Sequence, residues 1–567
     1  MTEPNQDKTS DWKLRDHFDR RYSAMESERL SFLPHWQEIN DYISPRTARI
    51  NITVNTAKGS KANQKIIDPT ATLALRSFKS GLMAGLTNPA RPWFKLSTSD
   101  PDLIKRADVK AWMYKAELTL YEILNRSNYY QVQSTKYGNL GLYGTAANSI
   151  LEDDKTVVRF YPFTTGSYML AMNPHLHCDS MYRNFPMTVR QLVQQFGLEN
   201  ISPTAKNLWD SQQYETEVEV RHCIEPNDDR DTFSFANEHK PCRSVYYETG
   251  ATQGLFLRKS GFDEFPIVAP RWDIFDESVY GFSPAMDCLG DIKQLQLEQR
   301  RKMEAIDKYV RPPMIGDSNL RTQQISLIPN GVTYVDGLAQ SSHAGLRPAY
   351  QVNPSIKELM EDINECQFRI KKTFFEDMMQ MLAQSDNPEM TAREIEERHS
   401  EKILIIGPMM ERMNDEDFDP TIIRVLNMVI RRGLLPPPPK DLQGKEYTIV
   451  YTSIMAQAMR LMGVANIGRV AQSVATYAAI DPKALDKFDV DEAIETEAMM
   501  YGINPKIIRT ADQVGQLREV RAKQQQMQQM AQMAKPMKEG AQAAKAMGET
   551  DGSNVADIIA TMTGGQA

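Results

Sequence analysis

The sequence predicts an α+β protein that carries a long helical hairpin, and three observations support this. Apolar residues recur at helical spacing from Tyr280 to Val310 and again from Ile356 to Leu382. Between these stretches, short β-prone segments flank Pro329-Asn330-Gly331, a sequence typical of a tight turn. Strand-like runs and isolated helices occupy most of the chain before Tyr280. Two long helices joined by a small β tip indicate a projecting arm rather than a compact enzyme core.

The ends of the two arm helices are marked by capping residues and breakers. Ser283 followed by Pro284 is an N-cap with proline at the first helical position, and nothing interrupts the pattern before Pro312. The first helix is therefore predicted as one rod of about 40 Å. The second is predicted as one continuous helix up to Leu382. Thr391 opens a capping box for a further helix, so Met381–Met390 is predicted to be a loop.

The chain before the arm is predicted to mix helices and strands. Residues 11–43 show a helical pattern kinked at Pro34, residues 44–65 resemble a loop, and helices follow over 71–82 and 109–124. Three glycines are assigned to the turn after the last of these, namely Gly138, Gly141 and Gly144. The predicted strands are Thr156–Tyr161, Ser167–Met172, Val218–Ile224, Ser244–Tyr247 and Phe265–Ala269, with one helix over Thr188–Phe196 among them.

The chain after the arm is predicted to be mainly helical. Pro436–Pro439 is interpreted as a polyproline linker and a domain boundary. Tyr447–Tyr451 is predicted to be a strand that returns to the α+β domain. Residues 453–530 are predicted to form a helical cluster, and the Gly/Ser-rich residues 531–567 a mobile tail.

Composition limits the possible partners. The chain has 567 residues, a net charge of −8 and a sequence pI near 5.7, whereas a protein that grips nucleic acid usually shows a basic footprint. Any contact with DNA is therefore expected to be loose or confined to a small surface. No run approaches 18 apolar residues, so no membrane span is expected. The five scattered cysteines are interpreted as reduced thiols.

No catalytic, cofactor-binding or metal-binding motif is evident. His175, His177 and Cys178 lie close in sequence, but no second cluster at a ligand spacing accompanies them, so they are interpreted as ordinary loop residues. The acidic run Asp415-Glu416-Asp417 lacks the glycine and closing glutamate of a calcium loop and is predicted to be a solvated turn. The three glycines after residue 124 do not match a phosphate loop, and packing is the better interpretation. The chain is predicted not to be an enzyme.

Two further features leave alternatives open. Arg91-Pro92-Trp93-Phe94 is a proline-framed aromatic turn, for which a role in anchoring the core is the favoured interpretation. Methionines cluster at Met378–Met390, Met409–Met413 and Met455–Met462. They suit either a surface that repacks or an ordinary apolar core.

Several spaced motifs together resemble those of the head-to-tail connecting, or portal, proteins of short-tailed bacteriophages. The resemblance covers roughly residues 15 to 450, and Ser283 stands where the family usually has a glycine. The residues that carry it include Arg76, Gly81, Gly85, Pro89, Arg91, Pro92, Trp93 and Phe94, then Pro270-Arg271-Trp272, and then Gly281 and Pro284.

The resemblance implies a ring, expected to be a dodecamer, at one vertex of the capsid. Its channel would admit double-stranded DNA without sequence preference during packaging and release it at infection. It would be assembled in the host cytoplasm and would contact the terminase or packaging ATPase, tail adaptors, and capsid and scaffolding proteins. The implied domains are a wing (1–280 and 391–452), a stem (281–311 and 355–384), a clip (312–354), a channel loop (385–390) and a crown (453–530).

Within this architecture, two sets of residues are candidates for contact with passing DNA. The loop set is Gln384, Ser385, Asp386 and Asn387, which would point toward the axis of a radial ring. The stem set is Lys293, Arg300 and Arg301, which would instead serve inter-subunit ion pairs if they do not face the channel. A solvated loop without a DNA role remains the alternative for the first set.

Two competing functions follow from the same residues. A cytosolic scaffold with a projecting helical arm that binds a partner protein is the main alternative. A DNA-packaging ATPase is disfavoured, because the phosphate loop is missing.

Overall fold

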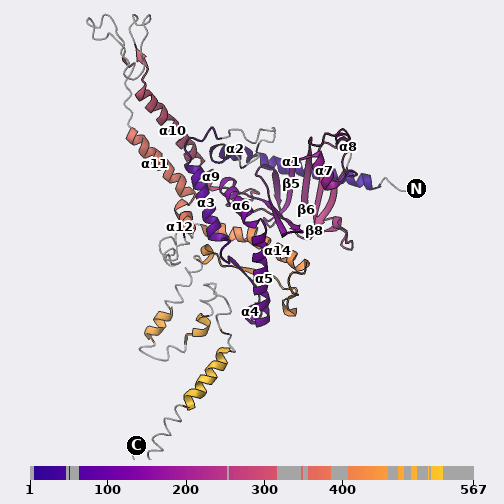
Figure 1. The fold of residues 1–567 in the computed structure, drawn as a ribbon, viewed down its shortest axis with the longest axis vertical. Helices are drawn as coiled ribbons and strands as arrows, with labels where there is room; N and C mark the ends of the chain where they lie inside the picture. The colour runs from indigo at the N-terminus through magenta and orange to yellow at the C-terminus, as the bar shows by residue number, and fades with distance from the viewer. Residues whose placement is uncertain are drawn as a thin grey trace, which may run out of the picture. The chain divides into compact units, whose positions relative to one another are not determined.

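The computed structural model describes residues 6–45, 47, 50, 63–251, 255–315, 347–348, 356–384, 406–457, 470–477, 487–494, 509 and 513–527. The chain divides into two compact units, Met1–Asn466 and Ile467–Ala567. Helices and strands mix throughout the first unit (Figure 1), which confirms the predicted α+β class. In the second unit, residues 470–477, 490–494 and 513–527 are helical.

The elements of the first unit have the following bounds. The helices are α1 Gln6–Leu30, α2 Leu33–Tyr42, α3 Thr70–Leu86, α4 Pro101–Lys105, α5 Ala107–Arg126, α6 Tyr129–Tyr143, α7 Val189–Phe196, α8 Pro203–Asp210, α9 Pro284–Asp287, α10 Leu289–Val310, α11 Ile356–Thr373, α12 Glu376–Gln384 and α14 Asp419–Arg431. The strands are β1 Phe94–Thr98, β2 Asn148–Asp153, β3 Val157–Pro162, β4 Tyr168–Met172, β5 Cys178–Thr188, β6 Glu217–Pro226, β7 Cys242–Glu248, β8 Arg258–Phe262, β9 Ile267–Val268, β10 Met314–Ile315, β11 Arg347–Pro348 and β12 Tyr447–Tyr451. Residues 406–413 are also helical and continue through one π-helical turn, Asn414–Phe418, into α14.

The largest sheet has five antiparallel strands in the order β4-β5-β6-β7-β8. The long helix α1 packs on it through Phe18, whose ring lies 6.1 Å from that of Tyr182 and 6.4 Å from that of Tyr247. The strands predicted near residues 168–172, 218–224 and 244–247 are confirmed as β4, β6 and β7. Strands β5 and β8 were not predicted, although β5 lies between β4 and β6.

Helices α3 and α6 pack against each other, and glycine allows them to lie close together. A Cβ atom on Gly141 would lie 2.8 Å from the ring of Phe78 on α3. This confirms a packing role for that glycine. The prediction that Gly138 and Gly141 belong to a turn is wrong, since both lie inside α6. Only Gly144 ends the helix, with a left-handed φ of +70° that favours glycine.

The turn before β1 anchors the core, as the sequence favoured. Trp93 and Phe94 are fully buried, and both of their backbone N–H groups donate to Tyr121 Oη on α5, at 2.9 and 2.7 Å. Phe94 then opens β1, which pairs with β12 along its whole length. The predicted return strand is therefore confirmed. Pro436–Pro439 lies within the first unit, with Trp112 Nε1 donating to the Pro436 carbonyl, so a boundary at this run is wrong.

Glu117 on α5 supports a pH-dependent prediction. Its carboxylate accepts from the Leu96 N–H at 2.8 Å, and burial raises its pKa to about 7. The folded chain therefore binds a proton that the unfolded chain releases between roughly pH 4.5 and 7, so this group makes stability fall as pH rises through that range. A Glu117→Gln variant keeps the acceptor without the charge. At pH 8 we expect it to be more stable by about 1–2 kcal/mol, allowing for partial exposure.

Thermal unfolding at pH 8 and pH 5 measures this difference, which should nearly vanish at pH 5. Glu122→Gln on the same helix is the matched control, because its side chain is 69% exposed and its carboxylate lies 3.6 Å from Arg126. A Glu117→Gln gain that is equal at both pH values would contradict the assignment.

The acidic run at residues 415–417 is not a solvated turn, and that prediction is wrong. Asp417 is fully buried, and its Oδ1 lies 2.5 Å from Lys136 Nζ on α6. Its other oxygen accepts from Gln133 Nε2 at 2.8 Å. The neighbouring Glu416 accepts from the guanidinium and the backbone N–H of Arg271. Asp417 is buried and Glu416 largely so because each meets a cation carried by a distant part of the chain, whereas Asp415 is exposed.

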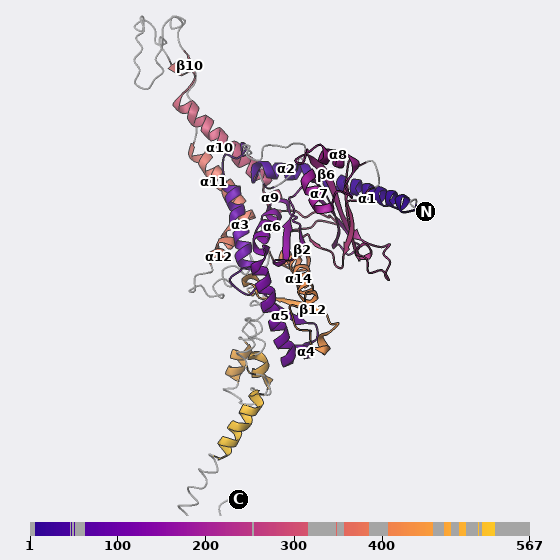
Figure 2. The same cartoon turned by 45° about the vertical axis from the view of Figure 1, so that its right-hand side comes forward.

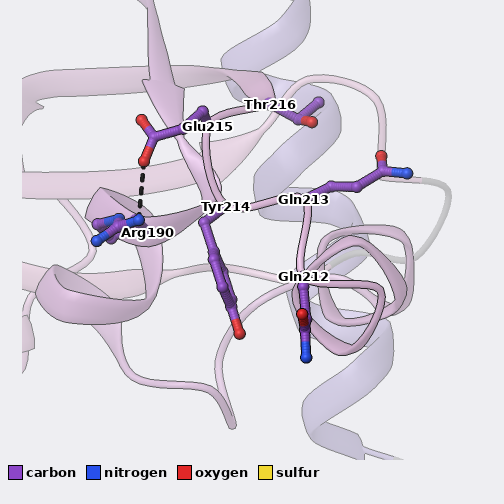
Figure 3. Close-up of a pocket in the computed structure, with 6 residues that line it drawn as sticks. All are labelled: Arg190, Gln212, Gln213, Tyr214, Glu215 and Thr216. Carbon is purple, nitrogen blue, oxygen red and sulfur yellow. Dashed lines mark ion pairs between the residues drawn. The ribbon is translucent and has the colours of Figure 1, made fainter.

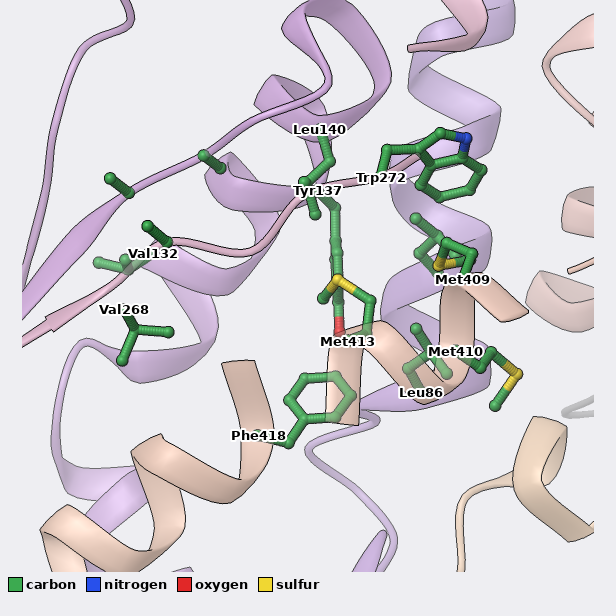
Figure 4. Close-up of a cluster of buried hydrophobic side chains, with 14 of the residues drawn as sticks. Leu86, Val132, Tyr137, Leu140, Val268, Trp272, Met409, Met410, Met413 and Phe418 are labelled. Carbon is green, nitrogen blue, oxygen red and sulfur yellow. The ribbon is translucent and has the colours of Figure 1, made fainter. Parts of the chain in front are cut away.

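The methionines near these carboxylates are core residues. Met409, Met410 and Met413 are all buried, and Figure 4 shows them between Leu86, Tyr137 and Trp272. Of the two interpretations of this cluster, the apolar core is therefore confirmed for these three. Met378, Met379 and Met455, from the other two clusters, are buried in the same core, and the remaining side chains of those clusters lie outside the described ones.

Each arm rod is broken once, which corrects the prediction of two continuous helices. The first breaks at Cys288, between α9 and α10. The second breaks between α11 and α12, where Phe375 has a φ of +53°. Phe374 is fully buried and packs edge-on against Phe78 of α3, at 6.1 Å between ring centroids. The bend brings α12 alongside α3, and this contact was not evident from helical periodicity.

Candidate functional site: the helical arm

The arm consists of α10 and α11, which lie side by side in both views (Figures 1 and 2). Arg369 Nε of α11 lies 3.0 Å from Asp291 Oδ1 of α10, and further along the arm the Asp362 and Glu298 carboxyl groups meet. The two helices are therefore antiparallel, with residue 298 opposite residue 362. The short strands β10 and β11, which pair Met314 with Pro348, lie beyond the far end of α10.

The arm begins at a close crossing with the end of α6. Ser283 caps α9 by accepting from the Met286 N–H at 3.1 Å, and its hydroxyl donates to the Leu142 carbonyl at 2.8 Å. The predicted serine cap is therefore confirmed. Beside it, Gly281 and Gly144 pass so closely that a Cβ on Gly144 would lie 2.6 Å from the Phe282 carbonyl carbon and nearer still to Gly281. The start of the arm thus depends on two facing glycines.

Asp68, in the segment before α3, holds both arm helices at once. Gln299 Nε2 of α10 and Gln367 Nε2 of α11 each donate to Asp68 Oδ2 at 2.9 Å. Gln296 adds two further contacts, accepting from the Asp68 N–H at 2.8 Å and donating to its carbonyl at 3.0 Å. Burial alone would raise the pKa of Asp68, but hydrogen bonds from Thr70, Gln367 and Gln299 outweigh it and lower the pKa. Asp68 is therefore a charged acceptor that positions the arm.

Helix α12 packs tightly against α3. A Cβ on Gly81 would lie 2.6 Å from the Cα of Met379, so only glycine allows this approach. Ser77 Oγ also donates to the Glu376 carboxylate at 3.3 Å. The family-motif residue Gly81 thereby sets the position of α12, which leads toward the predicted channel loop.

The far half of α10 exposes an apolar stripe. Met303, Ile306 and Val310 lie on the same face as the buried Ile292 and Leu295, yet they are 52%, 40% and 67% exposed. On α11, Met360 and Phe368 are 46% and 61% exposed. Within the described residues, the apolar pattern of the arm thus extends well past the part that the chain itself buries. Such a surface marks a contact with another molecule.

The arm also carries a carboxyl pair between its helices. Burial raises the pKa of Glu298, and the adjacent Asp362 carboxyl adds to the effect. Glu298 Oε1 accepts from Gln294 Nε2 at 2.6 Å, but its buried Oε2 has no hydrogen-bond partner among the described residues. A proton shared with the adjacent Asp362 carboxyl would satisfy this oxygen within the arm, which fits the raised pKa of Glu298.

The predicted DNA-contact residues are placed as follows. Lys293 Nζ lies 2.6 Å from Glu38 of α2, so it is paired within the chain. Arg300 and Arg301 are exposed on α10. Gln384 is the last residue of α12, and Ser385, Asp386 and Asn387 lie outside the described residues.

The family-motif residues are mostly structural in their placement. Gly81 and Gly85 are buried in α3, whereas Arg76 is exposed on the same helix. Pro89, Arg91 and Pro92 are exposed in the turn before Trp93, and Gly281 and Pro284 are buried at the start of the arm.

Sequence reasoning missed the Asp68 contacts and the acidic core pairs. A signal was present for the first. Gln296 and Gln299 occupy positions of the apolar stripe, and a polar side chain there must find a buried partner.

Other candidate sites in the described residues are weaker. The N–H groups of His175 and His177 both donate to Asn173 Oδ1, which defines a loop between β4 and β5. No group of three or more metal-ligating side chains is present within the described ranges. A pocket of about 420 Å³ lies beside Arg190, whose guanidinium pairs with Glu215 at 2.9 Å (Figure 3). None of the helices in the described ranges has the length and apolar composition of a membrane span.

An α+β body with a projecting arm whose apolar surface is partly uncovered defines a protein built to pack against other chains. Residues 15–508 match the model of the bacteriophage head to tail connecting protein family, and the chain belongs to that family. A portal protein of Salmonella phage epsilon15 is 42% identical over 542 residues, covering 95% of this chain and 96% of that protein. A probable portal protein of Bordetella phage BPP-1 is 40% identical over 501 residues, covering 88% and 90%.

One solved structure, described as the neck of an empty GTA particle computed with C6 symmetry, has a TM-score of 0.35 and 12% identity. The aligned region covers 77% of this chain and 95% of the other chain. A likeness this distant does not bear on the arrangement of the elements here.

Proposed function

We propose that this chain is the portal protein of its phage, forming a ring at one capsid vertex through which double-stranded DNA enters and leaves. Membership of the head-to-tail connecting family and the names of the two phage relatives support this role. In the same proposal, α10 and α11 form the stem, residues 312–354 the clip, and the α+β body the wing. The crown would comprise residues 453–530, and the ring twelve subunits.

The observation that carries the proposal is the uncovered apolar stripe of α10. No described residue fully covers the side chains of Met303, Ile306 and Val310. A neighbouring arm on each side would bury such a stripe if the subunits pack through a heterologous, ring-closing interface. A two-fold dimer would leave the second side of each arm exposed.

The net charge of the chain favours a channel in which DNA slides rather than a site that binds DNA tightly. Each phosphate contact adds affinity through counterion release, so a channel that lets DNA slide is better served by few such contacts. A net charge of −8 is consistent with this requirement. The role is structural, and ATP-driven translocation would belong to a separate packaging ATPase. Tail adaptors, capsid and scaffolding proteins would be the other partners, in the virion after assembly in the host cytoplasm.

Ring formation is the first test. The purified chain is expected to form rings with a central hole, visible by negative-stain electron microscopy, at micromolar concentration and moderate salt. Sedimentation should show one large species. Only monomers and dimers across that range would exclude the portal role and favour the alternative, a scaffold whose arm binds a different protein.

The segment after α12 is the proposed contact with passing DNA. Replacing Gln384, Ser385, Asp386 and Asn387 by Gly-Ser linkers is expected to leave rings intact but to slow packaging or release packaged DNA. Repetition around a ring would multiply a weak contact at each copy. The measurement is the amount of DNA packaged and retained in assembled particles. Normal packaging together with normal retention would show that the segment is a solvated loop without a DNA role.

A further inference from the structure

Two bands of opposite charge lie on the arm. Three consecutive cations, Arg300, Arg301 and Lys302, stand on α10, and within the described residues none of them has an ion-pair partner. On α11 four carboxylates lie within eight residues, namely Glu358, Glu361, Asp362 and Glu365. The salt bridges of Glu361 and Glu365 stay within α11, to Lys357 at 3.8 Å and to Arg369 at 3.0 Å. Both glutamates are more than 65% exposed, so these pairs hold them weakly.

The two bands lie at the same height along the arm. Glu298 meets Asp362, and both helices advance by about 1.5 Å per residue in opposite directions. Residues 300–302 are therefore level with residues 358–360, within about one turn of the four carboxylates.

Equal height matters because subunits of a closed ring are related by rotation alone. The interface is heterologous, so the two surfaces that meet are different patches of the chain. Both patches must lie at the same height along the ring axis. The cationic and anionic bands meet both conditions when arms pack side by side. Exposed apolar side chains, Leu297 on α10 and Met360 on α11, lie near the same level. An apolar centre with a charged rim is the usual anatomy of a protein interface.

We propose that the cationic band of α10 docks onto the anionic band of α11 in the next copy of this chain. The inference rests on the ring assembly proposed above and names the surfaces that would meet in it. The competing arrangement is intramolecular, with the same charges holding α10 to α11 within one chain.

Charge-reversal variants of the full chain distinguish the two arrangements. Arg300→Glu/Arg301→Glu makes both bands anionic, and Glu358→Arg/Glu361→Arg makes both bands cationic. Each variant alone places like charges across every contact and should raise the concentration at half-assembly by about tenfold or more. An equimolar mixture should return that concentration to the native value, because each variant then meets its complement in the neighbour. Such mixed rings alternate the two variants, which requires an even number of subunits.

Control variants carry the same charge changes away from the arm. Lys115→Glu/Arg126→Glu on α5 matches the first variant, and Asp16→Arg/Glu122→Arg matches the second. All four substituted control positions are exposed, and these variants should assemble as the native chain does. Circular dichroism checks that each arm variant keeps its helices.

The outcomes separate the inference from the function it rests on. Weak assembly of each variant with rescue in the mixture supports the trans contact. Rescue only when both reversals are combined in one chain would overturn it in favour of the intramolecular arrangement. Unchanged rings in both single variants would overturn the docking while leaving the portal role intact. Absence of rings from the native chain would overturn both.

Discussion

Replacing Asp417 with alanine is expected to lower the free energy of unfolding of the first unit by about 3–5 kcal/mol, because it leaves a buried ammonium without its partner. Lys136 Nζ lies 2.5 Å from Asp417 Oδ1, and the side chains are 3% and 0% exposed. Burial lowers the pKa of Lys136, while the Asp417 carboxylate opposes that effect. Once the carboxylate is gone, the ammonium must either remain charged in the core or give up its proton, and both cost free energy.

A second variant separates the unpaired charge from general damage to the core. Lys136→Met/Asp417→Asn removes both charges while keeping an oxygen for Gln133 Nε2, which donates to Asp417 at 2.8 Å. Buried ion pairs are often replaced by neutral side chains at little cost, so this double variant should recover at least half of the loss. Asp108→Ala is the exposed control. Its carboxylate pairs with Arg106 at 2.8 Å with both side chains near half exposure, so solvent screens the pair and its loss should cost far less than that of Asp417.

Urea unfolding of each variant, at a concentration below assembly, measures these differences as shifts of the midpoint at constant slope. If Asp417→Ala lowers the free energy of unfolding as little as Asp108→Ala does, the Lys136 ammonium must reach solvent in the variant. A double variant no better than the single one would mean that packing, rather than the charge, supplies the cost.

The parts of the fold that follow from local pattern were predictable from the sequence. Apolar periodicity located both arm helices, and the Ser283-Pro284 cap gave the start of the first. Alternating residues located β6 and the return strand β12. In each case the signal lies within about a dozen neighbouring residues, where side-chain spacing reports the burial of one face.

The parts that failed depend on residues far apart in the sequence. Gly138 and Gly141 suggested a turn, but they are helical because α6 must approach Phe78 of α3 closely. Strand β5 contains Pro186 and charged residues, and only pairing with β4 and β6 makes it a central strand. Glu416 is largely and Asp417 fully buried because Arg271 and Lys136 meet them from 145 and 281 residues away. Local propensity is overridden wherever such a partner exists.

The same distinction applies to the candidate site. The arm helices and their exposed charges follow from local sequence pattern, whereas the attachment of the arm to the body does not. Asp68 holds Gln299 and Gln367 from more than 200 residues away, and Gly144 meets Gly281 across 137 positions of the chain. The position of the arm on the body is therefore set by long-range contacts that no spacing rule reports.

Gly144→Ala is expected to lower the free energy of unfolding by about 3 kcal/mol or more. Two effects add at this position. Its φ of +70° disfavours any residue with a Cβ, and the new atom would lie 2.6 Å from the Phe282 carbonyl carbon. The clash is with backbone, which cannot rotate away as a flexible side chain can.

Gly433 and Gly281 separate these two effects. Gly433 has a φ of +67°, close to that of Gly144, but nothing within 4 Å of an added Cβ, so Gly433→Ala should cost only the conformational part, about 1 kcal/mol. Gly281 faces the same crossing, where an added Cβ would lie 3.0 Å from the Asp273 carbonyl oxygen and nearer to the Gly144 oxygen. Gly281→Ala should therefore show the steric cost. Calorimetric unfolding of the three variants should give the order of loss Gly144, Gly281, Gly433.

Ring formation should depend on the close approach of Gly144 and Gly281, and not only on the stability of the subunit. Around Gly144, the Gly281 N–H donates to Thr145 Oγ1 at 2.7 Å and the Trp272 N–H to the Gly144 carbonyl at 2.8 Å, so a shift there moves the start of the arm. Gly144→Ala and Gly281→Ala should each weaken ring formation, whereas Gly433→Ala should leave it unchanged. The double variant Gly144→Ala/Gly281→Ala should lose less stability than the two single variants added together. Moving the two backbone segments apart once relieves both clashes. Full additivity, or normal rings from Gly144→Ala, would show that the crossing does not position the arm.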